Sequence, residues 1–197
     1  MSVTIVPIVE GHGDAEAVPV LLRRIFAQVQ AYHVEVARPF RVKRNRVVKP
    51  GELERALLQA ARDRTNAASV LVLLDADDDC PAKLGPELLA RCQQTTNLPV
   101  AVVLANKEFE AWYLGAKESL RGLRGIRNSA VAPSAPEEVR DAKRALSENM
   151  EEGRYLEVDD QPALASQVDI SLARQRCPSF DKLVREVSNL TSAMGTP

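Results

Sequence analysis

Apolar runs alternate with amphipathic stretches along the first half of the chain. Apolar residues dominate 3–9, 70–74 and 99–105, as is typical of strands buried on both faces of a parallel sheet. Strands that alternate with helices predict an α/β fold in which a mostly parallel sheet is flanked by helices. The intervening stretches with apolar positions at helical spacing are residues 18–29, 53–61 and 84–92.

Residues 34–49 combine short alternating runs with the most basic stretch of the chain. Residues 34–36 and 40–42 alternate like short strands. The cations can contact phosphates, or they can protect a solvated hairpin at the edge of the sheet. Pro7 cannot donate a hydrogen bond to a neighbouring strand, so we expect it near a sheet edge or a strand irregularity. The cations are Arg38, Arg41, Lys43, Arg44, Arg46 and Lys49.

The pattern changes near residue 116. Residues 121–136 are rich in Gly, Pro, Ser and Arg, which predicts a loop. Helices are expected at 139–150, 161–168 and 179–194. We therefore expect residues 1–116 to form the α/β core, and residues 117–197 to form a helical C-terminal extension packed on that core.

Composition narrows the class of protein. A chain of 197 residues is long enough for one ordinary domain. A net charge of −1 argues against a standalone, high-affinity DNA-binding protein but leaves room for a local basic groove. The three cysteines show no metal-binding spacing, which suggests reduced thiols in a cytoplasmic protein. The N-terminus lacks a signal-peptide pattern, and no apolar run reaches membrane-spanning length, so we expect no membrane partner.

An acidic cluster follows the apolar run at 70–74. Asp75 and Asp77 occupy alternate positions, so both point the same way in an extended chain, and Asp79 joins them if the chain stays extended. Like charges this close favour a cation between them, and oxygen ligands suit Mg²⁺ or Mn²⁺. The alternative is a solvated acidic turn that caps the next helix.

Glu10 follows the first predicted strand. The carboxyl ends of parallel strands meet at one edge of a sheet, so Glu10 is expected near Asp75 and Asp77. The three carboxylates are enough for one or two Mg²⁺ ions with water completing the shell. This convergence favours a metal site over the alternative, in which Glu10 is only an anion at the start of a helix.

Two further stretches extend the candidate site. Gly11-His12-Gly13 lets a phosphate approach a helix N-terminus closely, although it matches neither the GxGxxG nor the Walker A pattern. His12 itself is expected in solvent, within reach of a phosphate. Glu108 and Glu110 belong to the next predicted helix, where positions two apart point nearly opposite ways. At most one of these two glutamates is therefore expected to face the acidic centre, and a solvated position is the alternative for either.

Together these motifs resemble a TOPRIM domain. That family carries a Glu in a small-residue turn after its first strand, here Glu10-Gly11, and an Asp-x-Asp, often extended by a third Asp, here residues 75–79. The chain also resembles small TOPRIM-like proteins related to the nuclease domain of the OLD (overcoming lysogenization defect) family. The resemblance is specific through about residue 114 and looser beyond it. The further matching positions are residues 108–112 (Glu-Phe-Glu-Ala-Trp), Lys143, Tyr155 and Ser179-Phe180.

The resemblance implies phosphodiester chemistry that depends on Mg²⁺ or Mn²⁺. Glu10 would bind metal or act as a general acid or base, and Glu110, ahead of Glu108, would supply a second metal site. The implied catalytic residues are Glu10 and Lys143, and the implied metal ligands are Glu10, Asp75, Asp77, Asp79 and Glu110. The residues expected to contact phosphate or nucleic acid are Gly11, His12, Gly13, Arg41 and Arg44.

We therefore predict a cytoplasmic, metal-dependent nuclease that acts on nucleic acid, DNA ahead of RNA, in DNA repair or anti-phage defence. Because related proteins are often encoded beside an ABC-type ATPase, the resemblance suggests such a partner; a homodimer stays an open option. The residues show no topoisomerase-type Tyr in a recognisable context, which favours hydrolysis over strand passage. The alternatives are a non-catalytic metal-binding module of an ATPase complex and a phosphatase for small substrates.

Overall fold

The fold is built on one parallel sheet. The computed structural model describes residues 3–62 and 66–194. The first residues of the predicted core and the last residues of the predicted extension lie outside the described residues, which leave out 1–2, 63–65 and 195–197. The sheet has five strands in the order β2-β1-β4-β5, and β3 also pairs with β1. Every pairing is parallel, which confirms the predicted α/β class. The strands are β1 (Val3–Val9), β2 (Val34–Val36), β3 (Phe40–Arg41), β4 (Ala67–Asp75) and β5 (Val100–Ala105).

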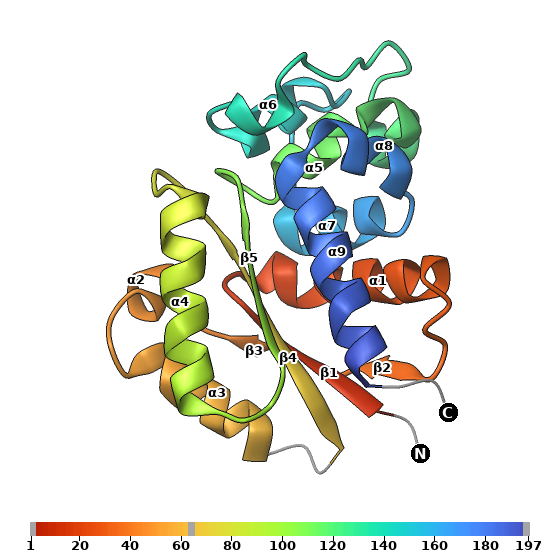
Figure 1. The fold of residues 1–197 in the computed structure, drawn as a ribbon. Helices are drawn as coiled ribbons and strands as arrows, with labels where there is room; N and C mark the ends of the chain where they lie inside the picture. The colour runs from red at the N-terminus through yellow and green to blue at the C-terminus, as the bar shows by residue number, and fades with distance from the viewer. Residues whose placement is uncertain (1–2, 63–65, 195–197) are drawn as a thin grey trace.

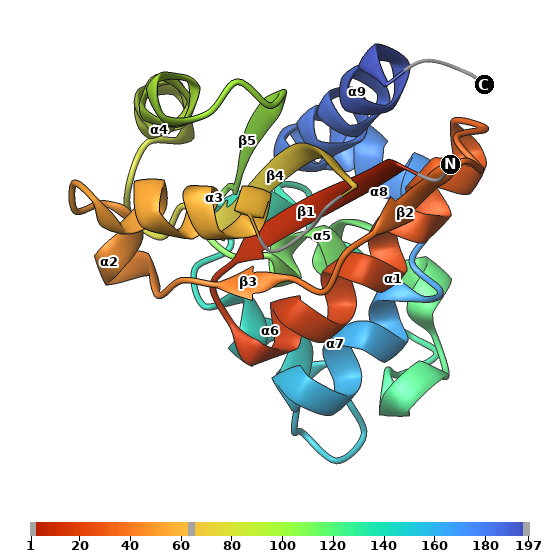
Figure 2. The same ribbon diagram turned by 90° about the horizontal axis from the view of Figure 1, so that it is seen from below.

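Each face of the sheet carries its own hydrophobic core, which explains why β1 and β4 are apolar at consecutive positions. Ile5, Val9 and Leu71 contribute to one core, whereas Val6 and Val70 contribute to the other. Helices α1 and α9 cover the first face, and helices α3 and α4 cover the second (Figures 1 and 2). The bounds are α1 (His12–Gln28), α3 (Glu52–Arg62), α4 (Pro81–Thr95) and α9 (Pro178–Ala193).

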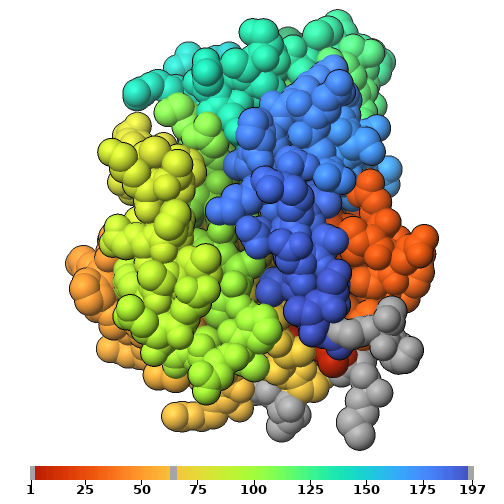
Figure 3. Space-filling model, in the orientation of Figure 1, coloured from red at the N-terminus to blue at the C-terminus, as the bar shows by residue number. Residues whose placement is uncertain are grey.

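The C-terminal third contributes directly to the core beside α1. Phe180, Leu183 and Val187 of α9 are buried in the same cluster as Leu21 of α1 and Val103 of β5. In Figure 3, α9 (blue) lies between α4 (yellow-green) and α1 (orange). Helix α5 (Glu110–Gly115) follows β5. The other helices of the C-terminal third are α6 (Ala142–Glu148), α7 (Glu157–Ala165) and α8 (Ile170–Arg176).

The boundaries of the smaller elements depend on local capping. The helix expected at 139–150 is α6, and it begins at Ala142 because the Asp141 carboxylate accepts a hydrogen bond from the backbone N–H of Arg144 at 3.1 Å. Helix α8 was not predicted. Within the described ranges, no helix combines the length and apolar character needed to cross a membrane. The remaining short elements are α2 (Arg44–Val47) and 3₁₀ turns at Lys117–Leu120, Leu123–Gly125 and Pro136–Glu138.

Of two expectations about the sheet edge, one is wrong and the other is confirmed. Strands β2 and β3 both run parallel to β1, so residues 34–42 form no hairpin. Pro7 lies near a strand irregularity, as expected, and not at an edge: it is inside β1, is paired with Leu71 of β4, and follows a register shift between Thr4 and Ile5. On its other side β2 ends opposite Ile5 and β3 begins opposite Ile8, so the missing N–H of Pro7 faces the gap between these two short strands.

Candidate functional site

Three strand ends converge at the carboxyl edge of the sheet. Strand β1 ends at Val9, directly before Glu10, and it pairs with β4 through Ile8 and Val72. Strand β4 ends at Asp75, which pairs with Ala105 at the end of β5. Consecutive parallel strands lie about 5 Å apart, so residues that follow these ends are brought together from distant parts of the sequence.

Asp75 is the last residue of β4, the middle one of these three strands. Its Oδ1 atom accepts a hydrogen bond from the backbone N–H of Phe109 at 2.8 Å, which ties β4 to the segment that follows β5. Burial raises the pKa of Asp75 well above its ordinary value, and the negative charges of Asp14 and Glu110 raise it further, against the opposing effect of Lys143. Asp75 therefore lies among other acids with incomplete compensation of its charge.

Glu110 faces the same centre from the start of α5. The residue is only 1% exposed, and its Oε1 atom accepts a hydrogen bond from the Tyr155 hydroxyl at 3.1 Å. Its Oε2 atom is buried and has no hydrogen-bond partner among the described residues. Burial raises the pKa of Glu110 to about 7, although the nearby Lys143 opposes this shift. Glu108 points elsewhere, because its Oε2 atom accepts a hydrogen bond from the backbone N–H of Lys143 at 3.2 Å.

Glu10 is intermediate in burial between the buried acids and the exposed ones. It is half-buried, and its Oε2 atom also lacks a hydrogen-bond partner within the described part of the chain. Burial raises the pKa of Glu10 above its ordinary value, and the negative charges of Asp77 and Asp14 act in the same direction. Glu10 and Glu110 thus each leave one buried carboxylate oxygen available for a ligand.

Asp14, in the first turn of α1, is a further acid at this site. Its Oδ2 atom accepts from the backbone N–H of Gly11 at 2.8 Å, and its Oδ1 atom accepts from Nε2 of Gln161 at 2.7 Å. Its negative charge contributes to the raised pKa values of Glu10 and Asp75. The Gln161 contact spans 147 positions in the sequence, so no local pattern could have revealed it.

The chain turns away after Asp75 and does not stay extended. Asp77 has a left-handed backbone conformation with φ of 52°, and the backbone N–H of Asp79 donates to the carbonyl oxygen of Ala76 at 2.9 Å. The side chain of Asp75 is consequently buried, whereas those of Asp77 and Asp79 are 59% exposed. The alternation expected for an extended strand therefore does not place all three carboxylates on one face.

Arg44 occupies the space beside the exposed acids. It is 8% exposed, and its Nε atom donates to the carbonyl oxygen of Asp75 at 3.0 Å. Its Nη2 atom donates to the Asp79 carboxylate, and Nε lies 3.9 Å from Oδ2 of Asp77. The guanidinium group is therefore engaged by the protein's own acids, although Arg44 also lines a surface hollow beside Glu10; contact with a phosphate stays a prediction.

Lys143 brings a second cation to the buried side of the site. Its Nζ atom lies 3.1 Å from Oε1 of Glu157. Burial alone would lower the pKa of Lys143, but the negative charges of Glu110, Asp75 and Glu157 outweigh it and raise the pKa. Lys143 is thus held in its protonated form near Glu110 and Asp75.

The glycine turn after β1 serves packing more than ligand approach. Gly13 is buried, and a Cβ atom at this position would lie 2.0 Å from Oε1 of Gln161 and 2.9 Å from the carbonyl oxygen of Glu157. Gly13 therefore allows α1 and α7 to approach closely, which corrects its expected role in phosphate contact. His12 and Arg41 are both exposed and line a hollow beside Glu10.

A buried polar network fixes the segment between β5 and α5. The Ser179 hydroxyl accepts hydrogen bonds from Nε1 of Trp112 at 2.8 Å and from the backbone N–H of Asn106 at 3.2 Å, and it donates to the Glu137 carboxylate. Phe180 packs edge-on against Trp112, with ring centroids 5.2 Å apart. These contacts hold the segment that carries Glu110, and Glu137 is a participant that the sequence did not indicate.

A divalent cation fits the chemistry of this edge. Among the residues that the structure describes, no three His, Cys, Asp or Glu side chains are already gathered as a metal site. The donor set is nevertheless that of a hard cation, because two buried carboxylate oxygens are unpartnered and the acids repel one another. The residues that would hold the cation are Glu10, Asp75 and Glu110; Asp77 lies beside Glu10, and Asp79 is paired with Arg44.

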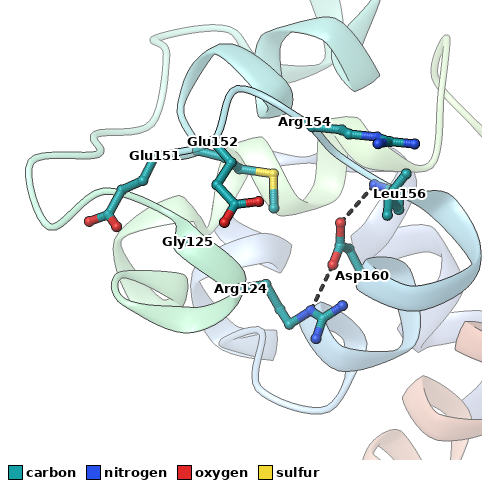
Figure 4. A pocket seen from close by; sticks show the side chains of 8 residues that line it. Arg124, Gly125, Glu151, Glu152, Arg154, Leu156 and Asp160 are labelled. Carbon is teal, nitrogen blue, oxygen red and sulfur yellow. Dashed lines mark hydrogen bonds and ion pairs between the residues drawn. The ribbon is translucent and has the colours of Figure 1, made fainter.

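A separate hollow lies next to α7 and contains none of the expected site residues. Its volume is about 360 Å³, and its lining includes Glu151, Arg154 and Asp160 (Figure 4). The buried Asp160 carboxylate accepts from Nε of Arg124 and from the backbone N–H of Leu156, both at 2.7 Å. Each carboxylate oxygen of Asp160 thus accepts a hydrogen bond that holds the start of α7 in place. We therefore assign Asp160 a structural role in this hollow.

Comparison with known proteins gives one match. The family described as "Domain of unknown function (DUF4276)" matches residues 9–188. This range includes Glu10, Asp75 and Glu110, which are here called the acidic edge. No curated protein and no solved structure matches the chain.

Proposed function

We propose that this chain, which belongs to the DUF4276 family, hydrolyses phosphodiester bonds in nucleic acid at its acidic edge with Mg²⁺ or Mn²⁺. The observation that carries the proposal is the placement of Glu10, Asp75 and Glu110 at or after the carboxyl ends of three neighbouring strands, with one buried carboxylate oxygen of Glu10 and one of Glu110 left unpartnered. Such an arrangement costs folding energy unless a cation compensates it, and perturbed acids of this kind cluster at functional sites.

The metal and the protein would divide the chemistry. A bound divalent cation supplies an acidic water molecule and neutralises charge on a phosphate. Glu10 is suited to accept a proton, because burial and neighbouring acids raise its pKa above the ordinary value and it lines the surface hollow. Lys143 stays protonated and can stabilise negative charge that develops on the phosphate oxygens.

Other residues would position these groups. The Tyr155 hydroxyl orients Glu110, and the hydrogen bonds from Gly11 and Gln161 orient Asp14. Partners of this kind around acidic ligands typically change metal affinity or activity by about 10–100-fold when they are removed. Tyr155 is therefore assigned a positioning role in the proposed reaction.

The setting of the proposed reaction follows from the resemblance to TOPRIM-like and OLD-family proteins. We place it in the cytoplasm, where reducing conditions suit the three free cysteines Cys80, Cys92 and Cys177. DNA is proposed ahead of RNA as the substrate, with an ABC-type ATPase as partner and DNA repair or anti-phage defence as the context. A partner that supplies affinity for DNA accords with a net charge of −1.

Cleavage assays with matched variants test this function. Supercoiled plasmid, single-stranded DNA and RNA are incubated with Mg²⁺ or Mn²⁺ and the wild-type chain, with and without a partner ATPase. Asp75→Asn keeps the acceptor for the Phe109 N–H but removes the charge, and it is expected to lower cleavage at least about 100-fold. Asp78→Asn is the control, because Asp78 belongs to the same turn and is 88% exposed. The proposal fails if no substrate is cut, or if Asp75→Asn cuts as well as wild type.

A metal-binding module without catalysis is the second candidate. It is favoured by the pairing of Arg44 with Asp79, which already neutralises part of the acidic cluster. Calorimetric titration with Mn²⁺ separates the two functions. Saturable binding that Glu110→Gln abolishes, without cleavage of any substrate, would support the module, whereas binding with cleavage supports the nuclease.

A further inference from the structure

Two surface hollows meet at Glu10. One, of about 610 Å³, is lined by Glu10, Arg41, Lys43 and Arg46 among others. The second, of about 640 Å³, is lined by Glu10, Lys43 and Asp77 among others. Because Glu10 and Lys43 line both hollows, a continuous path leads from a basic surface to the acidic edge.

The cations of the first hollow are free to bind a ligand. Arg41, Lys43 and Arg46 are all exposed, and none of them forms an ion pair with a residue in the described ranges. Arg55, in the same hollow, is instead paired with Glu52 at 3.1 Å. Three like charges with no internal counter-ion favour an anionic ligand at this surface.

The backbone that carries these cations is held at its start. Strand β3 pairs with β1 so that Arg41 lies opposite Val9, one residue before Glu10. The backbone N–H of Val42 donates to the carbonyl oxygen of Val9 at 2.8 Å. Arg44, buried against the carbonyl oxygen of Asp75, then fixes the beginning of α2.

Arg91 of α4 holds the other end of the same segment. It donates to the carbonyl oxygens of Val47 at 3.2 Å and Lys49 at 2.9 Å, and its Nε atom lies 2.7 Å from Oε1 of Glu54. The exposed cations are therefore displayed on a frame fixed by two internal arginines. A preformed surface loses little conformational entropy when a ligand binds.

We propose that the exposed cations Arg41, Lys43 and Arg46 of the first hollow, here named the basic track, bind the phosphate backbone of a nucleic-acid strand and lead it to Glu10. A small phosphate ester would need only one cation next to the acids, whereas three exposed cations line the first hollow and one of them, Lys43, also lines the second. Successive backbone phosphates match such a path. The identity of the acidic edge as the reaction centre rests on the function proposed above, but binding to the basic track is measurable without cleavage.

Binding of labelled oligonucleotides in the presence of EDTA tests the basic track. Fluorescein-labelled single-stranded and duplex DNA are titrated with the full chain over a range of salt concentrations. The double variant Arg41→Glu with Arg46→Glu is expected to lower affinity at least about tenfold, and to reduce the salt slope by about two. The control, Arg23→Glu with Arg62→Glu, changes the net charge equally at two exposed arginines on α1 and α3, and it is expected to bind nearly as wild type.

The outcomes separate this inference from the nuclease proposal. Equal loss of affinity in both double variants overturns the basic track, as does the absence of binding by the wild-type chain. Binding to heparin but not to either oligonucleotide also overturns it. Loss in the track variant alone supports the track even if no metal activates cleavage, a result that would overturn only the nuclease. Circular dichroism and urea titration confirm that each variant is folded.

Discussion

Individual side chains of the acidic edge destabilise the folded protein when no metal is bound. Glu110 is buried with one unpartnered carboxylate oxygen, and Asp75 is buried beside Asp14 and Glu110. An ionised carboxylate in such a place destabilises the folded protein unless a proton or a metal ion compensates it. The residues that cost stability in the metal-free protein are the residues that we assign to the metal.

Glu110→Gln is expected to stabilise the metal-free protein at alkaline pH. The pKa of Glu110 is about 7 in the folded protein against an ordinary value of 4.5. The stability contributed by its protonated form is therefore fully present below 4.5 and lost as the pH rises through about 7. We expect the variant to gain about 1–3 kcal/mol near pH 8 and little near pH 5, measured by urea unfolding in EDTA.

Glu108→Gln is the control for that measurement. Glu108 is partly exposed and accepts a backbone hydrogen bond from α6, so its loss should not produce the same gain at alkaline pH. An unchanged pH dependence in Glu110→Gln would contradict the description of Glu110 as a buried, destabilising acid.

At the scale of elements, the contact of α1 with α7 depends on Gly13. A Cβ atom there would lie 2.0 Å from Gln161 Oε1, closer than any packed structure allows. Gly13→Ala is therefore expected to lower the free energy of unfolding by about 1–3 kcal/mol in chemical denaturation. Gly85→Ala in α4, where the nearest atom is Nζ of Lys182 at 3.6 Å, should instead stabilise by about 0.5–1 kcal/mol. Equal effects of the two substitutions would contradict the tight contact.

Helices α2, α3 and α4 are joined by Arg91. Its hydrogen bonds to Glu54 lower the pKa of that carboxyl, so the pair stabilises the folded state above the ordinary pKa of 4.5. Arg91→Met is expected to lower stability by about 1–2 kcal/mol at neutral pH. The difference should shrink as the pH falls through the lowered pKa of Glu54, which thermal unfolding at several pH values measures. A difference independent of pH would show that lost packing, and not the ion pair, is responsible.

An element could be predicted when its own residues carry the hydrophobic pattern of that element. Strands β1, β4 and β5 were predicted because both of their faces are buried, so their sequences are apolar at nearly every position. The placement of Glu10 and Asp75 at the same edge of the sheet followed from the rule that parallel strands end at one edge. The chain direction after Asp75 did not, because a single left-handed residue, Asp77, turns the backbone.

Contacts between distant helices were the features that sequence could not supply. Asp14 meets Gln161, and Glu137 meets Ser179, across long separations in the chain. The first pair joins α7 to α1, and Ser179 of the second pair also accepts hydrogen bonds from Asn106 and Trp112, which follow β5. Local patterns identify which stretches are helices, but they do not show which surfaces the helices share.

At the scale of the whole molecule, the net charge of −1 is the sum over a locally basic surface and a locally acidic one. The basic track and the acidic edge lie next to each other, and Glu10 lines the hollows on both sides. Near-neutral overall charge is therefore compatible with local attraction of a polyanion and local binding of a cation.

Divalent metal is expected to stabilise the whole chain. A cation that binds only the folded protein adds about 2.7 kcal/mol at 100 times its dissociation constant, or about 5–10 °C in melting temperature for a domain of this size. Differential scanning fluorimetry with Mn²⁺ should show this rise in wild type and Asp78→Asn but not in Glu110→Gln. A rise of equal size in all three proteins would place the metal elsewhere.

Metal-dependent rescue of Asp75→Cys tests the central claim most directly. A thiolate is a poor ligand for Mg²⁺ but a good one for softer metals such as Cd²⁺. We predict that Asp75→Cys loses about 100-fold of cleavage in Mg²⁺ and recovers at least about tenfold when Cd²⁺ is added, relative to wild type and to Asp78→Cys under the same conditions. Equal loss in both metals, or no cleavage by the wild-type chain in any metal with its partner present, would contradict a metal-dependent reaction centred on Asp75.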